Sequence, residues 1–342
     1  MDKWWRPQAG WRVWARRVVS ASVLLLASCG GGADSPNGGA GESQASGGVG
    51  SGGTGSYSNG PITAFGSIVV NGVHYDHTSA VSIKKTGDDV TLHSAADLQL
   101  GMMVEVDVTP VADGGKLNIR YGSDLLGPVD SIDLTAQTLT VMGQVVSTFY
   151  VSDTNKTQFG TGLSSLADLA AGDVVEVYGF EDAGTGQYIA TRIERRVAYS
   201  SGPYVVRGAI QNLEKDSDGT VTGCTIGGQH IAYTWSSTSR PLVEGLVARA
   251  ELMRVHADSS EPWLAAKMVL SEPFTSADRG VALIDGLVTR IEPGSTTRFS
   301  VNGVDVDASL ADCPACSALT VGQRVSIKGA RVNGVIVASE IR

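Results

Sequence analysis

The sequence is poor in the residues that build broad binding surfaces and reactive sites. Aromatic residues make up 6% of the 342 residues, and there are five histidines and four cysteines. Four of the six tryptophans belong to the N-terminal segment, namely Trp4, Trp5, Trp11 and Trp14. Only Trp235 and Trp263 remain in the rest of the chain. A broad aromatic platform for stacking sugar rings is therefore not expected.

Short catalytic motifs are also missing. The sequence contains no GxSxG, HExxH or P-loop, the motifs that would place a nucleophile, a zinc ion or a phosphate. We therefore expect a protein that is not an enzyme and that holds no cofactor. Paired glycosidase carboxylates have no fixed spacing in sequence, so the alternative is a hydrolase that uses Asp/Glu pairs in a cleft between domains.

Positive charge is scarce. The formal net charge is −9, from 26 basic and 35 acidic residues. Residues 1–28 contain five of the basic residues and one of the acidic ones, so the remainder has 21 against 34 and a net charge of −13. A nucleic-acid partner needs a basic surface. We therefore expect no nucleic acid, and no attraction to an anionic membrane surface beyond a covalent anchor.

The N-terminal segment has the features of an export signal. Arg12, Arg16 and Arg17 precede the apolar run VVSASVLLLA at residues 18–27, the order of a secretory signal peptide. The run is well below the roughly 20 residues that span a bilayer. We therefore expect export and not a membrane-spanning helix.

The apolar run ends in LASC at residues 26–29. This resembles the lipobox of bacterial lipoproteins, whose cysteine sulfur receives a diacylglycerol before cleavage. The resemblance implies that Leu26, Ala27 and Ser28 are recognised by the signal peptidase, that residues 1–28 are removed, and that Cys29 becomes the lipidated N-terminus. Two or three acyl chains anchor a protein stably in a membrane. An ordinary signal peptide with a chance cysteine is the alternative.

Residue 30 bears on the location. It is glycine and not the aspartate that often retains such proteins at the inner membrane. For a Gram-negative cell the resemblance therefore implies the outer membrane, with the protein facing the periplasm or the surface.

A Gly/Ser-rich segment follows the lipobox. Glycine and serine together make up more than half of positions 30–60. Such a segment has no apolar period with which to form a core. We predict a disordered tether over residues 29–59, with a reach on the order of 30 Å. A spacer of unselected length is equally compatible.

The rest of the chain repeats one unit four times. The motif LAAGDVVEVYG at residue 169 has weaker copies at residues 98, 242 and 319. Its glycines are Gly101, Gly172, Gly245 and Gly322, which recur at nearly equal intervals. A near-fixed period indicates an internal repeat, and we place the four units at 60–122, 123–199, 203–272 and 281–342.

Each unit contains the same elements in the same order. An opening strand begins at a glycine, a tight hairpin follows, and the motif glycine leads into two further strands. Asn71-Gly72 and Asn302-Gly303 are strong hairpin signals because both residues of a type I′ turn have positive φ. We predict an all-β fold of four small OB-like or SH3-like barrels, each of about five strands. One helical turn plugs the barrel before the fourth strand; open sandwiches are the alternative.

The repeats also resemble a known family. The segments GPITAFGSIVVNGVHYD at residue 60, LAAGDVVEVYG at 169 and LTVGQRVSIKG at 319, with YIATRIE at 188 and VIVASEIR near the end, are similar to domain of unknown function 5666 of bacterial lipoproteins. The resemblance covers roughly residues 60–342 and is best in the first, second and fourth units. The third departs from it, with VEGLVARAEL and AAKMVL. The family brings no catalytic residues, and it implies tandem β domains in an envelope lipoprotein.

The three remaining cysteines follow Cys29. Cys313 and Cys316 form a CxxC pair, which can be redox-active, bind half of a zinc site or close a disulfide. No second CxxC exists, and an exported protein favours a disulfide that staples a loop. Pairing with Cys224 is a further alternative, although a buried inert thiol is the default for Cys224.

Three of the five histidines, His74, His77 and His93, fall in the first unit. A strand through residues 74–77 would place His74 and Asp76 on one face and His77 on the other. That arrangement is poor for joint chelation, so we expect no metal site. The function expected from the sequence is a non-catalytic lipoprotein whose domains bind an envelope protein or glycan, or act as spacers.

Overall fold

The computed structural model describes residues 55–87, 93–152, 155–182, 185–235, 241–254, 261–271, 277–311, 313 and 316–342. The predicted signal peptide, with Leu26, Ala27 and Ser28, and the predicted lipidation site Cys29 lie outside these residues. No helix in the described part is long and apolar enough to cross a membrane.

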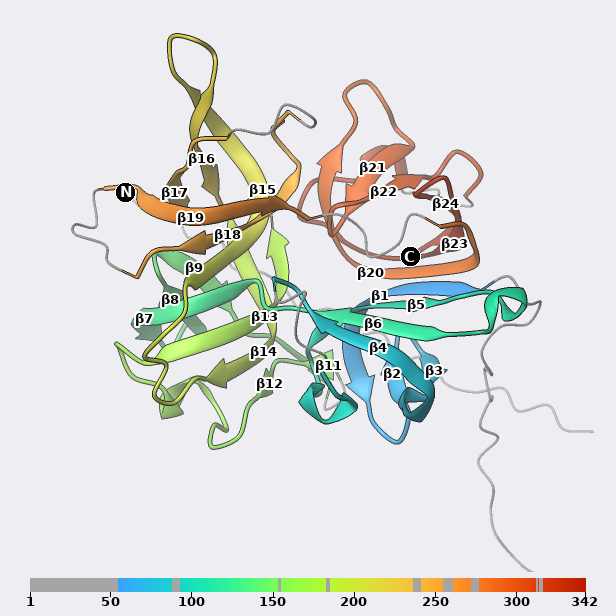
Figure 1. Cartoon of the computed structure of the whole chain (residues 1–342), viewed down its shortest axis with the longest axis horizontal. Helices are drawn as coiled ribbons and strands as arrows, with labels where there is room; N and C mark the ends of the chain where they lie inside the picture. Colours follow the sequence, from blue (N-terminus) through green and yellow to red (C-terminus); the bar gives the residue numbers. More distant parts are fainter. Residues whose placement is uncertain are drawn as a thin grey trace, which may run out of the picture. The chain divides into compact units, whose positions relative to one another are not determined.

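The described chain is all-β, with a few short 3₁₀ helices (Figure 1). The first repeat consists of β1 (Ser56–Ala64), β2 (Ile68–Val70), β3 (Val73–Tyr75), η1 (His77–Ser79), β4 (Ala80–Lys85), η2 (Ala95–Asp97), β5 (Met103–Val108), η3 (Val111–Asp113) and β6 (Leu117–Tyr121). The second consists of β7 (Leu125–Asp133), β8 (Thr138–Val141), β9 (Gln144–Ser147), β10 (Tyr150–Ser152), β11 (Asn155–Lys156), β12 (Gln158–Phe159), η4 (Leu166–Asp168), β13 (Val174–Asp182) and β14 (Gln187–Arg195).

Within the described residues, the third and fourth repeats have five strands each. The third consists of β15 (Tyr204–Lys215), β16 (Val221–Ile226), β17 (Gln229–Ala232), β18 (Val247–Leu252) and β19 (Trp263–Leu270). The fourth consists of β20 (Arg279–Ile291), β21 (Arg298–Val301), β22 (Val304–Asp307), η5 (Cys316–Ala318), β23 (Arg324–Val332) and β24 (Val335–Ile341).

Each repeat closes into a small barrel by the same pairing. In the fourth, β20 pairs with β21 and β23, β21 with β22, β23 with β24, and β22 with β24 in parallel. The third and second repeat this circuit, with β17–β19 and β9–β14 as the parallel pairs. In the first, the third strand is divided into β3 and β4, and β4 pairs with β6 in parallel. The predicted class of small all-β barrels is confirmed, and five strands closed in this order are OB-like.

The four motif glycines occupy equivalent positions. Gly101, Gly172, Gly245 and Gly322 have φ of +81°, +89°, +83° and +86°, a region that a residue without Cβ enters at little cost. Each N–H donates to a carbonyl oxygen in the first strand of its own barrel, 2.8–2.9 Å away; the acceptors are Ile62, Val129, Ile210 and Val288. This turn therefore begins the fourth strand in every repeat.

A 3₁₀ turn precedes this glycine in three repeats, where one helical turn is predicted. Ser94 and Ser165 cap η2 and η4 by capping boxes with Asp97 and Asp168. The turn presents apolar side chains to the barrel end, such as Leu166, which is 1% exposed. In the third repeat, residues 236–240 lie outside the described part of the chain.

The predicted tether is wrong at its C-terminal end. Ser56–Asn59 lie in β1, between β5 and a parallel neighbour, β20 of the fourth repeat. Tyr57 is fully buried in the hydrophobic core of that fourth repeat. The serine-rich composition predicts disorder, but the backbone hydrogen bonds of two neighbouring strands and one buried aromatic ring order these residues.

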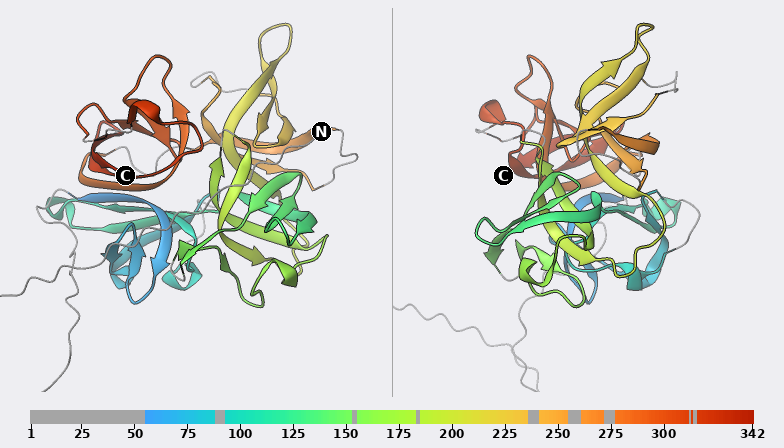
Figure 2. Two further views of the ribbon diagram at one scale, coloured as in Figure 1. Left: turned by 180° about the vertical axis from the view of Figure 1, so that it is seen from behind. Right: turned by 90° about the vertical axis from the view of Figure 1, so that its left-hand side faces the viewer.

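The barrels join in pairs by strand pairing. β1 pairs with β20, and β7 pairs with β15 through Leu125 and Leu126. One hydrophobic cluster contains side chains of both the second and third repeats, among them Leu125 and Val206. The described residues, from 55 onward, form one compact unit, and the views in Figure 2 show the strands of different repeats side by side. The repeats therefore share sheets and a hydrophobic core and are not separate domains joined only by linkers.

Candidate functional site

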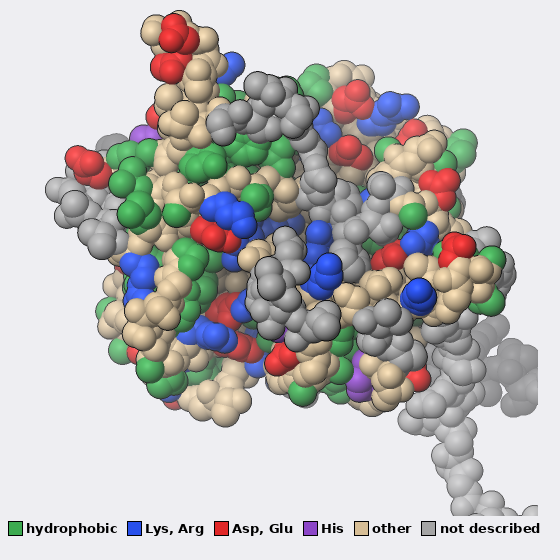
Figure 3. Space-filling model, viewed as in Figure 1, with side chains coloured by type: hydrophobic (Ala, Val, Ile, Leu, Met, Phe, Trp, Pro, Cys, Tyr) green, Lys and Arg blue, Asp and Glu red, His purple; other side chains and the backbone are tan. Residues whose placement is uncertain are grey.

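A cavity of about 310 Å³ lies where the four repeats meet. Its walls come from β5 and β6 of the first repeat, β13 of the second, β15, β18 and β19 of the third, and β20 with the β21–β22 turn of the fourth. Basic and acidic side chains gather in the middle of the face shown in Figure 3. Several charged groups line the cavity itself, so charge pairing decides its chemistry.

Asp124 and Arg207 form an ion pair at the cavity. Arg207 Nη1 donates to Asp124 Oδ1 at 2.9 Å, and the Gly179 N–H donates to Oδ2 at 2.9 Å. Burial raises the pKa of Asp124, and the Arg207 guanidinium and the Gly179 amide oppose that rise. Arg207 Nε donates to Ser271 Oγ at 3.2 Å. Both members of the pair are thus held in place by further hydrogen bonds within the protein.

Glu181, near the end of β13, presents a second carboxyl. Its Oε2 accepts a hydrogen bond from the Ala209 N–H, and its Oε1 is buried without a hydrogen-bond partner. Gly208 makes room for it, because a Cβ there would lie 2.5 Å from the carboxyl carbon. Burial raises the pKa of Glu181 from 4.5 to about 7, although the Ala209 N–H and Arg207 oppose the rise. Near neutral pH the cavity therefore borders a carboxyl that exchanges its proton.

The third repeat contributes most of the basic side chains that line the cavity. Arg207 on β15 lies directly opposite Arg249 on β18, and Glu251 lies opposite Lys267 on β19. Arg249 Nη1 donates to Glu251 Oε1 at 2.8 Å, but the buried Arg249 Nε has no partner. Like charges directly opposite in a sheet are destabilising, so the carboxylates of Asp124 and Glu251 offset the repulsion between the two arginines.

The first repeat forms the facing wall. Arg120 Nη2 pairs with Glu105 Oε2 at 2.8 Å. Gly87 packs closely against Arg249: a Cβ on Gly87 would lie 2.5 Å from Arg249 Nη1. Arg249 is only 8% exposed as a result. The guanidinium is therefore held in place by two repeats that are far apart in the sequence.

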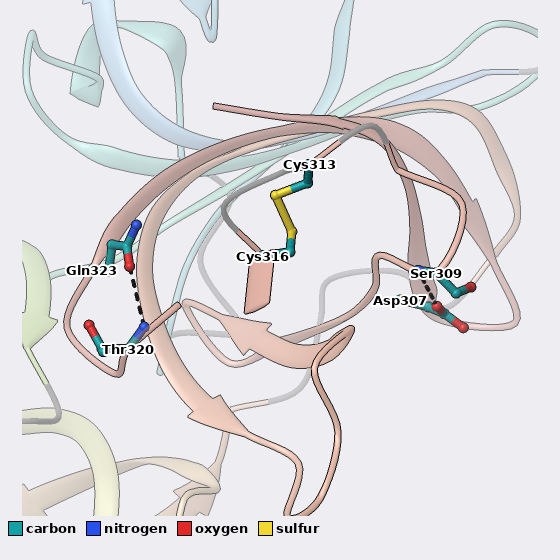
Figure 4. The surroundings of a disulfide bond; sticks show 6 residues. All are labelled: Asp307, Ser309, Cys313, Cys316, Thr320 and Gln323. Carbon is teal, nitrogen blue, oxygen red and sulfur yellow. Dashed lines mark hydrogen bonds between the residues drawn. A yellow bond between two sulfur atoms is a disulfide. The ribbon is translucent and has the colours of Figure 1, made fainter. Parts of the chain in front are cut away.

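The predicted cysteine pair lies elsewhere. The structure joins Cys313 and Cys316 by a disulfide at the end of the fourth barrel (Figure 4). Cys316 is 8% exposed and begins η5, at the place that Leu166 takes in the second repeat. Cys224 is a buried free thiol, and burial raises its pKa to about 11. These cysteines do not line the cavity.

The three histidines of the first repeat do not converge. His74 Nδ1 lies 2.8 Å from Ser67 Oγ, His77 begins η1, and His93 packs edge-on against Tyr121 with ring centroids 5.6 Å apart. Within the described part of the chain, no three His, Cys, Asp or Glu residues are grouped to hold a metal ion.

Sequence reasoning missed every charged residue of the cavity. Asp124 lies in the short segment between two repeats, and Arg207 and Arg249 lie on strands at positions that a single barrel would expose to solvent. Glu181 lies near the end of its strand, opposite the buried Tyr188. The available signal was weak: Arg207 and Arg249 interrupt two otherwise apolar runs, YVVRGAI and LVARAEL. Only the packing of one barrel against another brings them together.

The family model for Domain of unknown function (DUF5666) matches residues 59–117, 127–194 and 285–342. The chain belongs to this family. The DUF5666 matches coincide with the first, second and fourth repeats and skip the third, the one that departs from the pattern in sequence. The third is also the repeat that contributes Arg207, Arg249 and Lys267 to the cavity.

Comparisons beyond DUF5666 add little. No curated protein matches the chain. A solved structure, drosophila Unr CSD456, is 16% identical and covers 64% of this chain and 95% of that one, with a TM-score of 0.16. At that TM-score the overlap does not bear on the fold or the function.

Proposed function

We propose that this protein is a lipid-anchored, non-catalytic binding protein of the cell envelope whose central cavity holds a small polar molecule. One observation carries the proposal: four repeats line a cavity bordered by Glu181 and Arg249, and each of these two side chains has a buried polar atom, Oε1 and Nε respectively, without a hydrogen-bond partner. A buried polar atom without a partner costs about 1–3 kcal/mol. A bound ligand that pairs with both atoms would remove this cost, whereas a mere spacer has no use for such a cavity.

The sequence leads us to expect an envelope protein or a glycan as the partner, and the size of the cavity favours the smaller kinds of ligand. About 310 Å³ is at the lower end of ligand pockets. It suits a small metabolite or one terminal unit of a glycan, and it is too small for a segment of an envelope protein. The acidic body of the chain argues against nucleic acid.

The anchor is proposed from the lipobox. Cys29→Ala should leave an uncleaved or mislocalised precursor that no longer incorporates labelled fatty acid, because the thiol is the acyl acceptor. Cell fractionation with metabolic labelling measures both effects. Normal processing and membrane retention of this variant would refute the anchor, and with it the outer-membrane location.

Ligand binding is tested with native mass spectrometry. The full chain, purified from its own host under mild conditions, should carry a small molecule that Val269→Trp lacks. Val269 lines the cavity on β19 and is 37% exposed, so a larger side chain fills the space without entering the barrel core. Equal ligand content in both proteins, or none in either, would overturn the proposal.

A hydrolase is the second candidate function, and one observation favours it. Glu181, with a pKa of about 7, lies close enough to Asp124 for the Asp124 charge to add to that rise, and general acids work best with a pKa near the operating pH. Incubating the isolated ligand with the protein distinguishes the candidates. Product formation that Glu181→Gln abolishes would establish catalysis, and unchanged ligand would support binding.

A further inference from the structure

We propose that the cavity binds a small hydroxy acid, an organic anion that carries hydroxyl groups beside its carboxylate. The inference rests on the proposed binding function and names the chemistry of its ligand. It follows from the charges on one wall and from the two polar atoms that lack partners.

The wall formed by β15, β18 and β19 has one cation too many. It presents Arg207, Arg249 and Lys267, and the only carboxylates paired with these cations within the described residues are those of Asp124 and Glu251. On the facing wall Arg120 is already paired with Glu105. Glu181 also borders the cavity, so one further negative charge completes the balance when that carboxyl is protonated.

Arg249 is the group best placed to receive that charge. Its Nη1 is bound to Glu251, while its Nε points to no acceptor although the residue is 8% exposed. A guanidinium binds a carboxylate through N–H groups in a rigid fork. Lys267 lies on β19, the strand next to the one that carries Arg249. It is exposed and adds a positive charge at the cavity. Together they favour a carboxylate at this end.

Glu181 Oε1 requires a different group. Ionised Glu181 accepts hydrogen bonds only, whereas protonated Glu181 also donates. A hydroxyl satisfies both forms, because it donates and accepts. A second ligand carboxylate at this place would face Glu181 and Asp124 and be repelled. The ligand therefore presents hydroxyls to Glu181 and its carboxylate to Arg249.

Three probes of similar length separate the requirement for a carboxylate from the requirement for hydroxyl groups. Gluconate carries a carboxylate and hydroxyls, sorbitol carries hydroxyls without charge, and hexanoate carries the charge without hydroxyls. Isothermal titration of ligand-free full chain at pH 7 should show gluconate binding at least tenfold more tightly than the other two. Gluconate that does not bind, or that binds no more tightly than sorbitol or hexanoate, would overturn the inference.

Variants locate the binding. Arg249→Gln and Lys267→Gln should each weaken gluconate binding about tenfold or more, and Val269→Trp should abolish it. Arg298→Gln, an exposed arginine on β21 outside the cavity, is the matched control and should bind like the wild type. Lys267 is exposed, so its variant tests the idea even if Arg249→Gln fails to fold. Unchanged binding by Lys267→Gln and Val269→Trp would refute the site.

The outcome is separable from that of the proposed function. A neutral or cationic molecule found in the cavity by native mass spectrometry, together with no gluconate binding, would reject the hydroxy acid and keep the binding function. An empty cavity with no binding of any probe would reject both.

Discussion

At the scale of single residues, Glu181 is an unusual group among the described residues. A carboxyl is normally ionised at neutral pH, but here one oxygen is buried without a partner and the pKa is raised to about 7. The position is created by Gly208, which lies inside β15 (Tyr204–Lys215) and leaves space for a side chain of the second repeat.

Glu181 should make stability fall as pH rises. Below about pH 4.5 the carboxyl is protonated in both the folded and the unfolded chain; between 4.5 and 7 only the folded chain keeps the proton. The free energy of unfolding therefore declines across this window and levels off above it. The full decline is about 3 kcal/mol, since a tenfold change in proton affinity is worth roughly 1.4 kcal/mol.

Glu181→Gln measures this contribution, because the amide is neutral at every pH and retains an oxygen for the Ala209 N–H. Urea denaturation at pH 4 and pH 8 should show a smaller loss of stability in Glu181→Gln than in the wild type. The exposed Glu292→Gln variant is the control and should follow the wild type. Parallel pH profiles for all three proteins would contradict the buried, raised-pKa carboxyl.

At the scale of elements, the turn before the fourth strand is the feature that all repeats share. Its glycine has positive φ in each copy, but the surroundings differ. Around Gly172 there is open space, whereas a Cβ on Gly101 would collide with the Thr191 carbonyl oxygen of the neighbouring repeat. The same turn is therefore an exposed corner in one barrel and a contact between barrels in another.

Replacing Gly101 and Gly172 by alanine should separate the cost of positive φ, which both share, from the cost of a steric clash, which only Gly101 has. Gly172→Ala should cost about 1–2 kcal/mol, the penalty of a left-handed backbone with a Cβ. Gly101→Ala carries the same penalty and in addition about 1–3 kcal/mol for overpacking. Urea midpoints with unchanged m-values give the two costs. Equal costs would show that the Gly101 turn is not packed against the second repeat.

The disulfide between Cys313 and Cys316 is expected to act only locally. It closes a loop with a sequence separation of 3, so reduction should lower global stability by less than the roughly 3 kcal/mol that chain entropy gives for a 15-residue loop. Thiol alkylation with mass spectrometry on protein from the envelope should find both cysteines oxidised, and metal analysis should find no zinc. Free thiols at both positions, or one zinc per chain, would refute the staple.

At the scale of the whole molecule, the fourth repeat packs against the first. Arg279, at the start of β20, makes two hydrogen bonds to Asp107 on β5, at 2.6 and 2.9 Å, and each side chain is 6% exposed. β1 lies between these strands, and its Tyr57 enters the fourth core. The two ends of the folded chain are thereby joined by a buried ion pair and a shared sheet.

Asp107→Asn should be strongly destabilising, by about 3–5 kcal/mol, because it leaves a buried guanidinium without its counter-charge. Glu340→Gln is the control: its partner Arg342 is 80% exposed, and exposed pairs contribute at most about 1 kcal/mol. Thermal and urea unfolding of both variants gives the comparison. A loss at Asp107 no larger than that at Glu340 would contradict the buried junction.

The sequence by itself determined the repeated unit. Residues such as Gly172 and Asn71-Gly72 specify positive φ, and alternating apolar residues specify strands with one buried face; both are local properties that recur with a period. It also determined that the third copy departs from the family, because VEGLVARAEL and AAKMVL differ from the shared segments and the family model passes over them.

Only the tertiary structure decided how the four barrels combine. Tyr57 lies in a serine-rich segment, yet it is buried because β20, from the repeat at the opposite end of the folded chain, pairs beside it. Arg207 and Arg249 occupy outward positions of their own barrel, where the local pattern predicts solvent. Glu181 lies opposite the buried Tyr188 near the end of β13. These three charged residues meet because strands from other repeats cover them, and contacts between faces so distant in sequence leave no period by which they could be predicted.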